Sequence, residues 1–181
     1  IPNLTVMAPK NKWELQDMME YAFSLDRPVA IRYPRGIAYD GLEKVRAKIE
    51  YGKSELIYEE KDIALIAVGS MVSTAEHIRE KLKDKGYSCT LVNGRFIKPV
   101  DEDMIDYLSK HHKYIMTLEE NVKRGGFGEV ITDYIAKHHP TLRVTNITLP
   151  DEYVEHGDVT KLRSVLGIDS DSVLKKIEGR L

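Results

Sequence analysis

The sequence has only one cysteine, Cys89. A single cysteine excludes an internal disulfide framework and a multi-cysteine zinc site, and it fits a reducing compartment. We therefore expect a cytoplasmic protein. Cys89 falls inside a short apolar segment, so we interpret it as a small core residue rather than a reactive thiol.

Long apolar runs and an excess of one charge are also missing. No apolar stretch approaches the ~20 residues that a membrane helix needs, so we expect no membrane contact. The net charge of −2 gives no basic field, and nucleic acid is therefore not expected as a partner. At 181 residues, 42% hydrophobic and 31% charged, the chain suits one well-buried domain, alone or with part of another.

Residues 62–101 predict a strand–helix–strand unit. The apolar run 63–68, closed by a glycine and a serine, is typical of a strand buried on both faces of a parallel sheet. Ser73 and Glu76 have the spacing of a capping box, which predicts a helix start at this point. Apolar residues at helical spacing follow, and residues 87–92 predict a second strand parallel to the first.

The rest of residues 54–181 continues this alternation. Residues 54–60 predict an edge strand that turns at Lys61 into the strand 63–68, with its charges protecting the exposed edge. Further along we expect a helix capped by Asp101, a strand over 113–119, a helix after 125–128, a strand over 142–149 and two short helices on either side of Gly167. The fold class is therefore α/β, with a mostly parallel sheet covered by helices on both faces.

Residues 1–36 predict a separate strand–helix–strand unit. Its strands are expected over 4–8 and 29–33, with a helix capped by Asn11 between them. Two strands and one helix cannot bury their own faces, so this unit has the character of the end of a further, incomplete α/β domain. Residues 37–53, which are rich in charge and contain Gly41, are expected to form a linker to a complete domain over 54–181.

The run Arg32-Tyr33-Pro34-Arg35-Gly36 is the most suggestive polar motif. It follows a predicted buried strand, and ligands of parallel sheets bind beyond the carboxyl ends of the strands. Two arginines at such a place could hold a phosphate or a carboxylate through paired hydrogen bonds. The alternative is a pair of ordinary surface salt bridges.

Two further motifs lie at similar positions. The segment 93–99 follows the strand 87–92, and its Arg95 could bind a ligand or pair with a neighbouring carboxylate. The Gly-Gly-Phe-Gly run at 125–128 opens a helix, where free N–H groups can hold a phosphate. It lacks the spacing of a dinucleotide fingerprint, so we interpret it as a structural turn.

The histidines give no metal or catalytic site. The pairs at 111–112 and 138–139 are predicted to be solvated residues at helix ends. His156 has no second histidine or cysteine at metal-ligand spacing, so we interpret it as structural or as an interface residue. A nucleophile elbow, a P-loop and a zinc motif are all absent from the sequence. We therefore assign no catalytic, cofactor-binding or metal-binding residue.

Taken in order, several motifs resemble the C-terminal part of the 1-deoxy-D-xylulose 5-phosphate synthases, a family of transketolase-like thiamine diphosphate enzymes. They are PNLTVMAP, PVAIRYPRG, ALIAVGSMV, NGRFIKPVD, TLEENVKRGGFGEVI and LPDEYVEHG. The resemblance covers nearly the whole chain. It implies that residues 1–36 end the middle, pyrimidine-binding domain and that 54–181 form the transketolase-like C-terminal domain.

The resemblance also implies a function for a longer parent enzyme. Such an enzyme condenses pyruvate, with decarboxylation, and D-glyceraldehyde 3-phosphate into 1-deoxy-D-xylulose 5-phosphate on thiamine diphosphate and Mg²⁺, as a homodimer. Arg35 matches the arginine that holds the acceptor phosphate, and Arg32 and Tyr33 would support it. Arg95 matches a motif position that we expect to be structural or at a domain interface.

The family's metal-binding Gly-Asp-Gly motif is incomplete here, because only Gly157 and Asp158 match it. The family glutamate that contacts the aminopyrimidine is also missing. We therefore expect this chain alone to bind neither cofactor and to be inactive without an N-terminal remainder. Two alternatives stay open: the beta subunit of a 2-oxo-acid dehydrogenase, and a non-catalytic interaction module for dimer contacts. The RYPRG loop disfavours the first, and the unfinished unit 1–36 disfavours the second.

Overall fold

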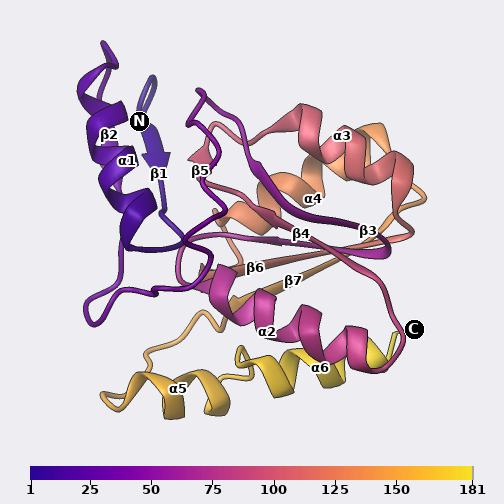
Figure 1. Cartoon of the computed structure of the whole chain (residues 1–181). Coiled ribbons are helices and arrows are strands. Elements are labelled where there is room, and N and C mark those ends of the chain that lie inside the picture. Colours follow the sequence, from indigo (N-terminus) through magenta and orange to yellow (C-terminus); the bar gives the residue numbers. More distant parts are fainter. Residues whose placement is uncertain (181) are drawn as a thin grey trace.

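The computed structural model describes residues 1–180, which form two β-sheets and six helices (Figure 1). Sheet A has the strand order β2-β1-β5, and sheet B has the order β4-β3-β6-β7. The elements are β1 Thr5–Met7, α1 Lys12–Phe23, β2 Val29–Ile31, β3 Glu55–Ala67, α2 Met71–Asp84, β4 Cys89–Asn93, β5 Phe96–Lys98, α3 Glu102–His111, β6 Tyr114–Val122, α4 Phe127–His138, β7 Arg143–Leu149, α5 Val159–Val165 and α6 Ser170–Glu178.

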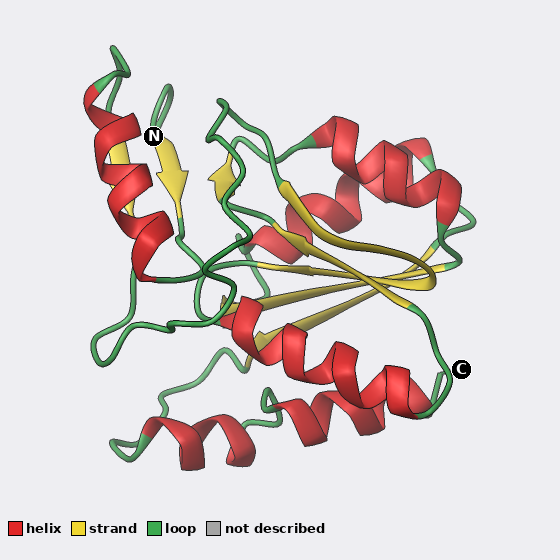
Figure 2. Ribbon diagram, viewed as in Figure 1, coloured by secondary structure: helices red, strands yellow, loops and turns green. Residues whose placement is uncertain are grey.

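Sheet B is the parallel, doubly covered sheet that the sequence predicts. Helices α2 and α6 lie on one face, and α3 and α4 lie on the other (Figure 2). Successive side chains of a strand point to opposite faces, so Ile63 and Leu65 pack in one cluster while Ala64 and Ile66 pack in the other. Burial of each large apolar side chain contributes about 1.5–3 kcal/mol, and this burial on both faces stabilises the domain.

Strand β3 has two halves that run in opposite directions. Along Glu55–Tyr58 the residue numbers of the β4 partners fall from 93 to 91. Along Ile63–Ala67 they rise from 89 to 93. The chain reverses at Asp62, whose φ is 59°. The predicted edge strand that turns near Lys61 is therefore confirmed. The expectation that its charges protect the exposed edge is wrong for Glu55, which is buried and accepts hydrogen bonds from Lys10 and from the Ala47 N–H.

Sheet A contains a strand that the sequence analysis missed. The strand–helix–strand unit is present, with β1 and β2 parallel. However, β5 also joins this sheet and pairs antiparallel with β1, although it comes from residues assigned to the second domain. Met7, Met18, Ile49 and Phe96 form the small core beneath it. The segment between β2 and β3 contains no helix or strand, as expected of a linker, yet its Ile49 belongs to this core.

The outer side of sheet A remains open within the described chain. Only β1 pairs with β2, so the second edge of β2 has no strand beside it among residues 1–180. On α1, Met18 is buried, whereas Met19 and Phe23 are exposed. None of the described helices combines the length and apolar character needed to cross a membrane.

The helix starts follow local side-chain chemistry. Asn11 and Asp101 cap α1 and α3 by accepting hydrogen bonds from the N–H groups of Glu14 and Met104, as predicted. The capping box at Ser73 is wrong. Helix α2 begins at Met71, so Ser73 already lies inside its first turn. The Ser73 hydroxyl donates to the Ser70 carbonyl oxygen and Glu76 accepts from the Tyr39 hydroxyl, so neither side chain caps the helix.

Candidate functional site

The motif 32–36 forms an exposed loop directly after β2. Its first residue is fixed, because the Arg32 N–H donates to the Met7 carbonyl oxygen at 2.8 Å. Its far side is fixed at Tyr39, whose carbonyl oxygen accepts a hydrogen bond from the Lys12 N–H at 3.2 Å. The loop between these anchors is solvent-facing, and Gly36 permits its turn with a φ of 136°. A loop held at both ends can present side chains to a ligand at a low ordering cost.

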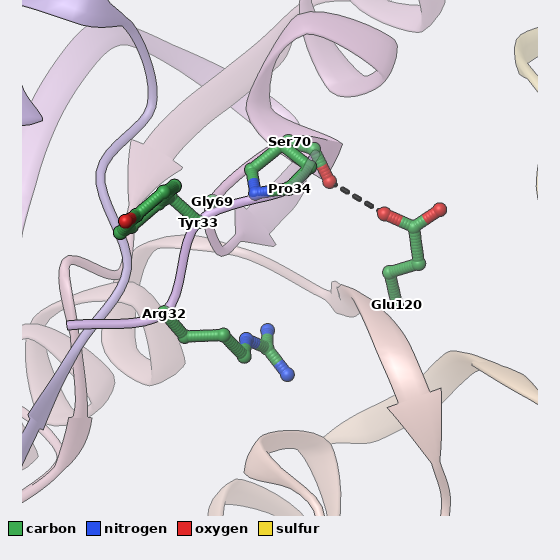
Figure 3. Close-up of a pocket in the computed structure, with 6 residues that line it drawn as sticks. All are labelled: Arg32, Tyr33, Pro34, Gly69, Ser70 and Glu120. Atoms are coloured by element: carbon green, nitrogen blue, oxygen red, sulfur yellow. Dashed lines mark hydrogen bonds between the residues drawn. The ribbon is translucent and has the colours of Figure 1, made fainter. Parts of the chain in front are cut away.

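This loop separates two clefts. The smaller, of about 230 Å³, is lined by Arg32, Tyr33, Pro34, Gly69, Ser70 and Glu120 (Figure 3). The larger, of about 650 Å³, has among its lining residues Lys10, Tyr33, Arg35, Tyr39, Ser70 and Arg163. Arg32 therefore lines one cleft and Arg35 the other, and only Tyr33 of the three predicted binding residues borders both. The structure does not bring the two arginines together.

The cleft beside Arg32 contains one carboxylate, that of Glu120. In Figure 3 the Glu120 carboxylate is joined to Ser70, while the Arg32 and Tyr33 side chains extend in different directions. Glu120 accepts hydrogen bonds from Ser70 Oγ at 2.7 Å and from Arg163 Nε at 3.0 Å. Burial acts to raise the pKa of Glu120, but these hydrogen bonds and the nearby positive charges outweigh it and hold the pKa below its usual value. The ion-pair partner of Glu120 is thus Arg163, and Arg32 is only one of the nearby positive charges.

Arg35 borders the larger cleft. Like Arg32 it is exposed, and neither arginine side chain makes a hydrogen bond or ion pair with another residue of the described range 1–180. The other cations of the larger cleft are already neutralised, because Lys10 pairs with Glu14 and Glu55, and Arg163 pairs with Glu120. A guanidinium that is free to donate several hydrogen bonds suits a phosphate or carboxylate ligand. Arg32 and Arg35 are therefore both candidates for ligand binding, and Arg35 is the one that borders the larger cleft.

The glycine-rich turn before α4 is structural, as interpreted from the sequence. Its helix N-terminus is already occupied by Glu119, which accepts hydrogen bonds from the N–H groups of Phe127 and Gly128 at 2.9 and 2.8 Å. Burial raises the pKa of Glu119, although these two amides act in the opposite direction. A Cβ at Gly126 would lie 2.6 Å from the Val122 carbonyl oxygen, so this position requires glycine. An internal carboxylate thus takes the place of a bound anion.

The remaining candidates from the sequence lie away from both clefts. Arg95 is buried and forms ion pairs with Glu14 and Glu55, as expected of an interface residue. The prediction that His112 is a solvated residue at a helix end is wrong, because His112 is buried and its Nε2 lies 2.8 Å from Thr90 Oγ1. His156 is exposed in the loop before α5.

The described residues do not form a metal site. Within 1–180, no three His, Cys, Asp or Glu side chains converge in a way that could hold a metal ion. The clefts beside Arg32 and Arg35 contain cations and one neutralised carboxylate, which is the wrong donor set for Mg²⁺. These two clefts therefore do not fit Mg²⁺.

Comparison with known proteins identifies the class. Residues 52–173 match the family described as transketolase, C-terminal domain, and the chain belongs to this family. This match includes β3 to β7 and leaves out β1, α1 and β2. The parallel sheet with helices on both faces is thus the transketolase C-terminal fold.

The similar curated proteins carry the name of one particular enzyme. The chain is 51% identical to 1-deoxy-D-xylulose-5-phosphate synthase of Lachnoclostridium phytofermentans, over 98% of this chain and 28% of that protein. It is 42% identical to the synthase of Syntrophomonas wolfei, over 99% and 28%, and 37% identical to that of Aquifex aeolicus, over 100% and 29%. The chain therefore spans somewhat more than a quarter of the length of the curated relatives it matches.

Solved structures with low sequence identity share the fold. A split gene transketolase, described as an inactive beta4 tetramer, superposes with a TM-score of 0.90 at 21% identity, over 99% of this chain and 58% of that one. Transketolase from Campylobacter jejuni superposes with a TM-score of 0.75 at 15% identity, over 98% and 26%. Both superpositions include residues 1–31 as well as the family domain, because they cover almost the whole chain.

Proposed function

We propose that this chain is the C-terminal part of a 1-deoxy-D-xylulose 5-phosphate synthase. The whole enzyme would join pyruvate, with loss of CO₂, to D-glyceraldehyde 3-phosphate and release 1-deoxy-D-xylulose 5-phosphate. The names of the curated relatives and the coverage of nearly all of this chain support the proposal. Thiamine diphosphate and Mg²⁺ would bind the N-terminal remainder. The enzyme would be a homodimer in the cytoplasm.

Within this reaction we assign to Arg35 the binding of the acceptor phosphate. The observation that carries this assignment is the free, exposed guanidinium at the edge of the larger cleft. Pro34 restricts the backbone before it, so little freedom is lost when the side chain meets a phosphate. Tyr33 borders the same cleft and would support the loop, whereas Arg32 would contribute through its charge beside Glu120.

The chemistry of the loop is that of orientation. A phosphate held by Arg35 fixes one end of the three-carbon acceptor, so its aldehyde can be presented to the two-carbon donor in a defined direction. The carbon–carbon bond is formed at the cofactor, which the rest of the enzyme would hold. The loop therefore contributes to binding of the acceptor and not to activation of pyruvate.

A 2-oxo-acid dehydrogenase beta subunit fits less well. Its acceptor would be a lipoyl group, which has no phosphate for Arg35 to bind. The three synthases compared above all carry the same enzyme name. An interaction module without catalysis likewise gives no reason for an unpaired arginine beside a cleft of about 650 Å³.

Steady-state kinetics of Arg35→Ala in the full-length enzyme would test the assignment. We expect the KM for D-glyceraldehyde 3-phosphate to rise roughly 30-fold or more, because each charge-assisted hydrogen bond contributes about 1.5–3 kcal/mol. The KM for pyruvate should stay within about 2-fold, because pyruvate carries no phosphate. Arg143→Ala is the matched control, since Arg143 is an exposed arginine at the start of the edge strand β7 and lines neither cleft.

Equal losses for both substrates in Arg35→Ala would show that the loop only supports the fold, and the assignment would then be wrong. The cofactor assignment has its own test. Calorimetry of this chain with thiamine diphosphate and Mg²⁺ should show no binding. A micromolar dissociation constant for residues 1–181 would overturn the placement of the cofactor in the N-terminal remainder.

A further inference from the structure

Tyr39 joins the far end of the arginine-bearing loop to helix α2. Its hydroxyl donates a hydrogen bond to Glu76 Oε2. Glu76 lies in the second turn of α2, three residues after Ser73, and both Ser73 and Tyr39 line the larger cleft. The contact therefore connects two walls of this cleft, one from the segment between the two sheets and one from the family domain.

The backbone around Tyr39 is held by the N-terminal unit instead. The Tyr39 carbonyl oxygen accepts a hydrogen bond from the Lys12 N–H at 3.2 Å. Two residues later, the Gly41 carbonyl oxygen accepts one from Asn11 Nδ2 at 3.0 Å. Asn11 and Lys12 belong to the start of α1. The main chain near Tyr39 is thus tied to α1, whereas its hydroxyl is tied to α2.

The Tyr39 side chain is built into this position. A Cβ at Gly41 would overlap the Tyr39 hydroxyl, so glycine at that residue gives the ring the room it needs. Burial raises the pKa of Tyr39, and the hydrogen bond to Glu76 raises it further. The hydroxyl therefore keeps its proton and acts as a donor at neutral pH.

Glu76 has a second tyrosine partner that carries no loop. The Tyr58 hydroxyl donates to Glu76 Oε1 at 3.5 Å, which is at the long end of the hydrogen-bond range. Tyr58 belongs to β3, and the guanidinium of Arg79 lies 4.0 Å from the centre of its ring. Tyr58 lines neither cleft. The two tyrosines thus share a carboxylate but differ in their relation to the cleft.

We propose that Tyr39 is a positioning residue for the arginine that binds the acceptor phosphate. The near end of the loop is fixed by the Arg32 N–H, and the Tyr39 hydroxyl fixes its far end against α2. A loop fixed at both ends has fewer conformations, so Arg35 loses less freedom when it meets a phosphate. Tyr39 acts through Arg35 and not by contact with the phosphate. The inference rests on the proposed function, because it takes Arg35 as the phosphate-binding group.

The experiment removes single hydroxyl groups in the full-length enzyme. Tyr39→Phe should raise the KM for D-glyceraldehyde 3-phosphate roughly 5-fold, because a small misplacement of a binding group weakens its contact. The turnover number and the KM for pyruvate should stay within about 2-fold, since neither depends on the acceptor phosphate. Tyr58→Phe is the matched control, which removes the other hydroxyl from the same carboxylate. It should leave all three values unchanged.

Variants of Glu76 test whether the hydrogen bond is the cause. Glu76→Ala removes the acceptor and should raise the acceptor KM as much as Tyr39→Phe does. Glu76→Gln keeps an acceptor oxygen and should leave this KM within about 2-fold of the unchanged enzyme. The double variant Tyr39→Phe/Glu76→Ala should be no worse than either single variant, because both changes remove one interaction. Fully additive effects would overturn the proposal, as would an unchanged acceptor KM in Tyr39→Phe.

Hydrogen exchange gives a readout that does not depend on activity. In the chain of 181 residues, Tyr39→Phe should accelerate amide exchange at Lys12, whose N–H donates to the Tyr39 carbonyl oxygen. Tyr58→Phe should not, and equal rates at Lys12 in both variants would contradict the anchoring role.

Arg35→Ala, measured in parallel, separates the two possible failures. If it leaves the acceptor KM unchanged, the proposed function is wrong and the positioning role fails with it. If Arg35→Ala raises the KM while Tyr39→Phe does not, only the positioning role is wrong.

Discussion

Lys10 Nζ lies 2.7 Å from Glu55 Oε2, and both side chains are only 1% exposed. The contact joins two parts of the fold, since Lys10 lies in the loop after β1 of sheet A and Glu55 begins β3 of sheet B. The amide of Asn93 donates to Glu14 at 2.9 Å and to Glu55 at 3.2 Å, so the carboxylates share a further partner. Burial of these charges is tolerated because each has an opposite charge and hydrogen bonds.

The first prediction concerns this pair. Lys10→Met should lower the free energy of unfolding by about 3–5 kcal/mol, because it leaves two buried carboxylates facing a single cation. Chemical denaturation of the 181-residue chain measures it. Lys61→Met, at the exposed turn of β3, is the control and should change the value by less than about 0.5 kcal/mol.

The double variant Lys10→Met/Glu55→Gln should recover part of this loss, since it restores the charge balance around Arg95. The loss of unfolding free energy in the double variant is compared with the sum of the losses in the two single variants. A loss larger than this sum would show that the buried charge imbalance is not the cause of the destabilisation.

The second prediction concerns the turn before α4. Gly126→Ala should destabilise the chain by about 1–3 kcal/mol, because the new Cβ would overlap the Val122 carbonyl oxygen at 2.6 Å and Glu119 Oε1 at 2.7 Å. Gly179→Ala is the control, since its nearest atom lies at 3.6 Å. Thermal unfolding of both variants gives the comparison. A melting temperature of Gly126→Ala equal to that of Gly179→Ala would contradict the packing described here.

The third prediction is a pH dependence at Glu120. Its pKa in the folded chain lies below the ordinary value of 4.5, so the ionised carboxylate stabilises the fold above that value. This contribution is lost as the pH falls through the lower folded-state pKa. Unfolding free energies measured from pH 7 down to about 3 should therefore fall less steeply in Glu120→Gln than in the unchanged chain. Glu43→Gln, at an exposed position, should keep the original slope.

The fourth prediction concerns the thiol. Burial raises the pKa of Cys89 to about 12. At pH 8 the folded chain should therefore contain roughly 1000-fold less thiolate than the unfolded chain and react correspondingly slowly with iodoacetamide or an aromatic disulfide. Labelling with and without denaturant checks this. Similar rates in both conditions would mean that the strand β4 opens readily or that Cys89 is not buried.

Much of sheet B follows from local sequence patterns. The run 63–68 is apolar at every position, and only a strand with helices on both faces buries all of them, as observed. Asn11 and Asp101 cap helices because their short oxygens reach a free N–H within three residues. Such contacts are local, so a reading of neighbours in the sequence is enough to find them.

The missed features are those made between distant segments. Strand β5 has three residues and pairs with β1, roughly ninety positions earlier, so no local period reveals it. Glu55 has the pattern of an edge charge, and its burial depends on Lys10 and Arg95. Arg32 and Arg35 line two different clefts, whose other walls include Glu120 and Arg163, 85 and 128 positions after Arg35. The predicted roles of Arg32, Tyr33 and Arg35 stay predictions.

The pairing of β5 with β1 has a consequence for cooperativity. The family match begins at residue 52, but a polypeptide reduced to that range would keep Arg95, Glu55 and β5 while losing Lys10, Glu14 and the strand that β5 completes. Two charged side chains and the edge of a strand would be uncovered at one time. We therefore expect the segment that unfolds as one unit to be longer than the segment matched by the family. Residues 1–31 and the parallel sheet should unfold in a single transition, although their sequences belong to different modules.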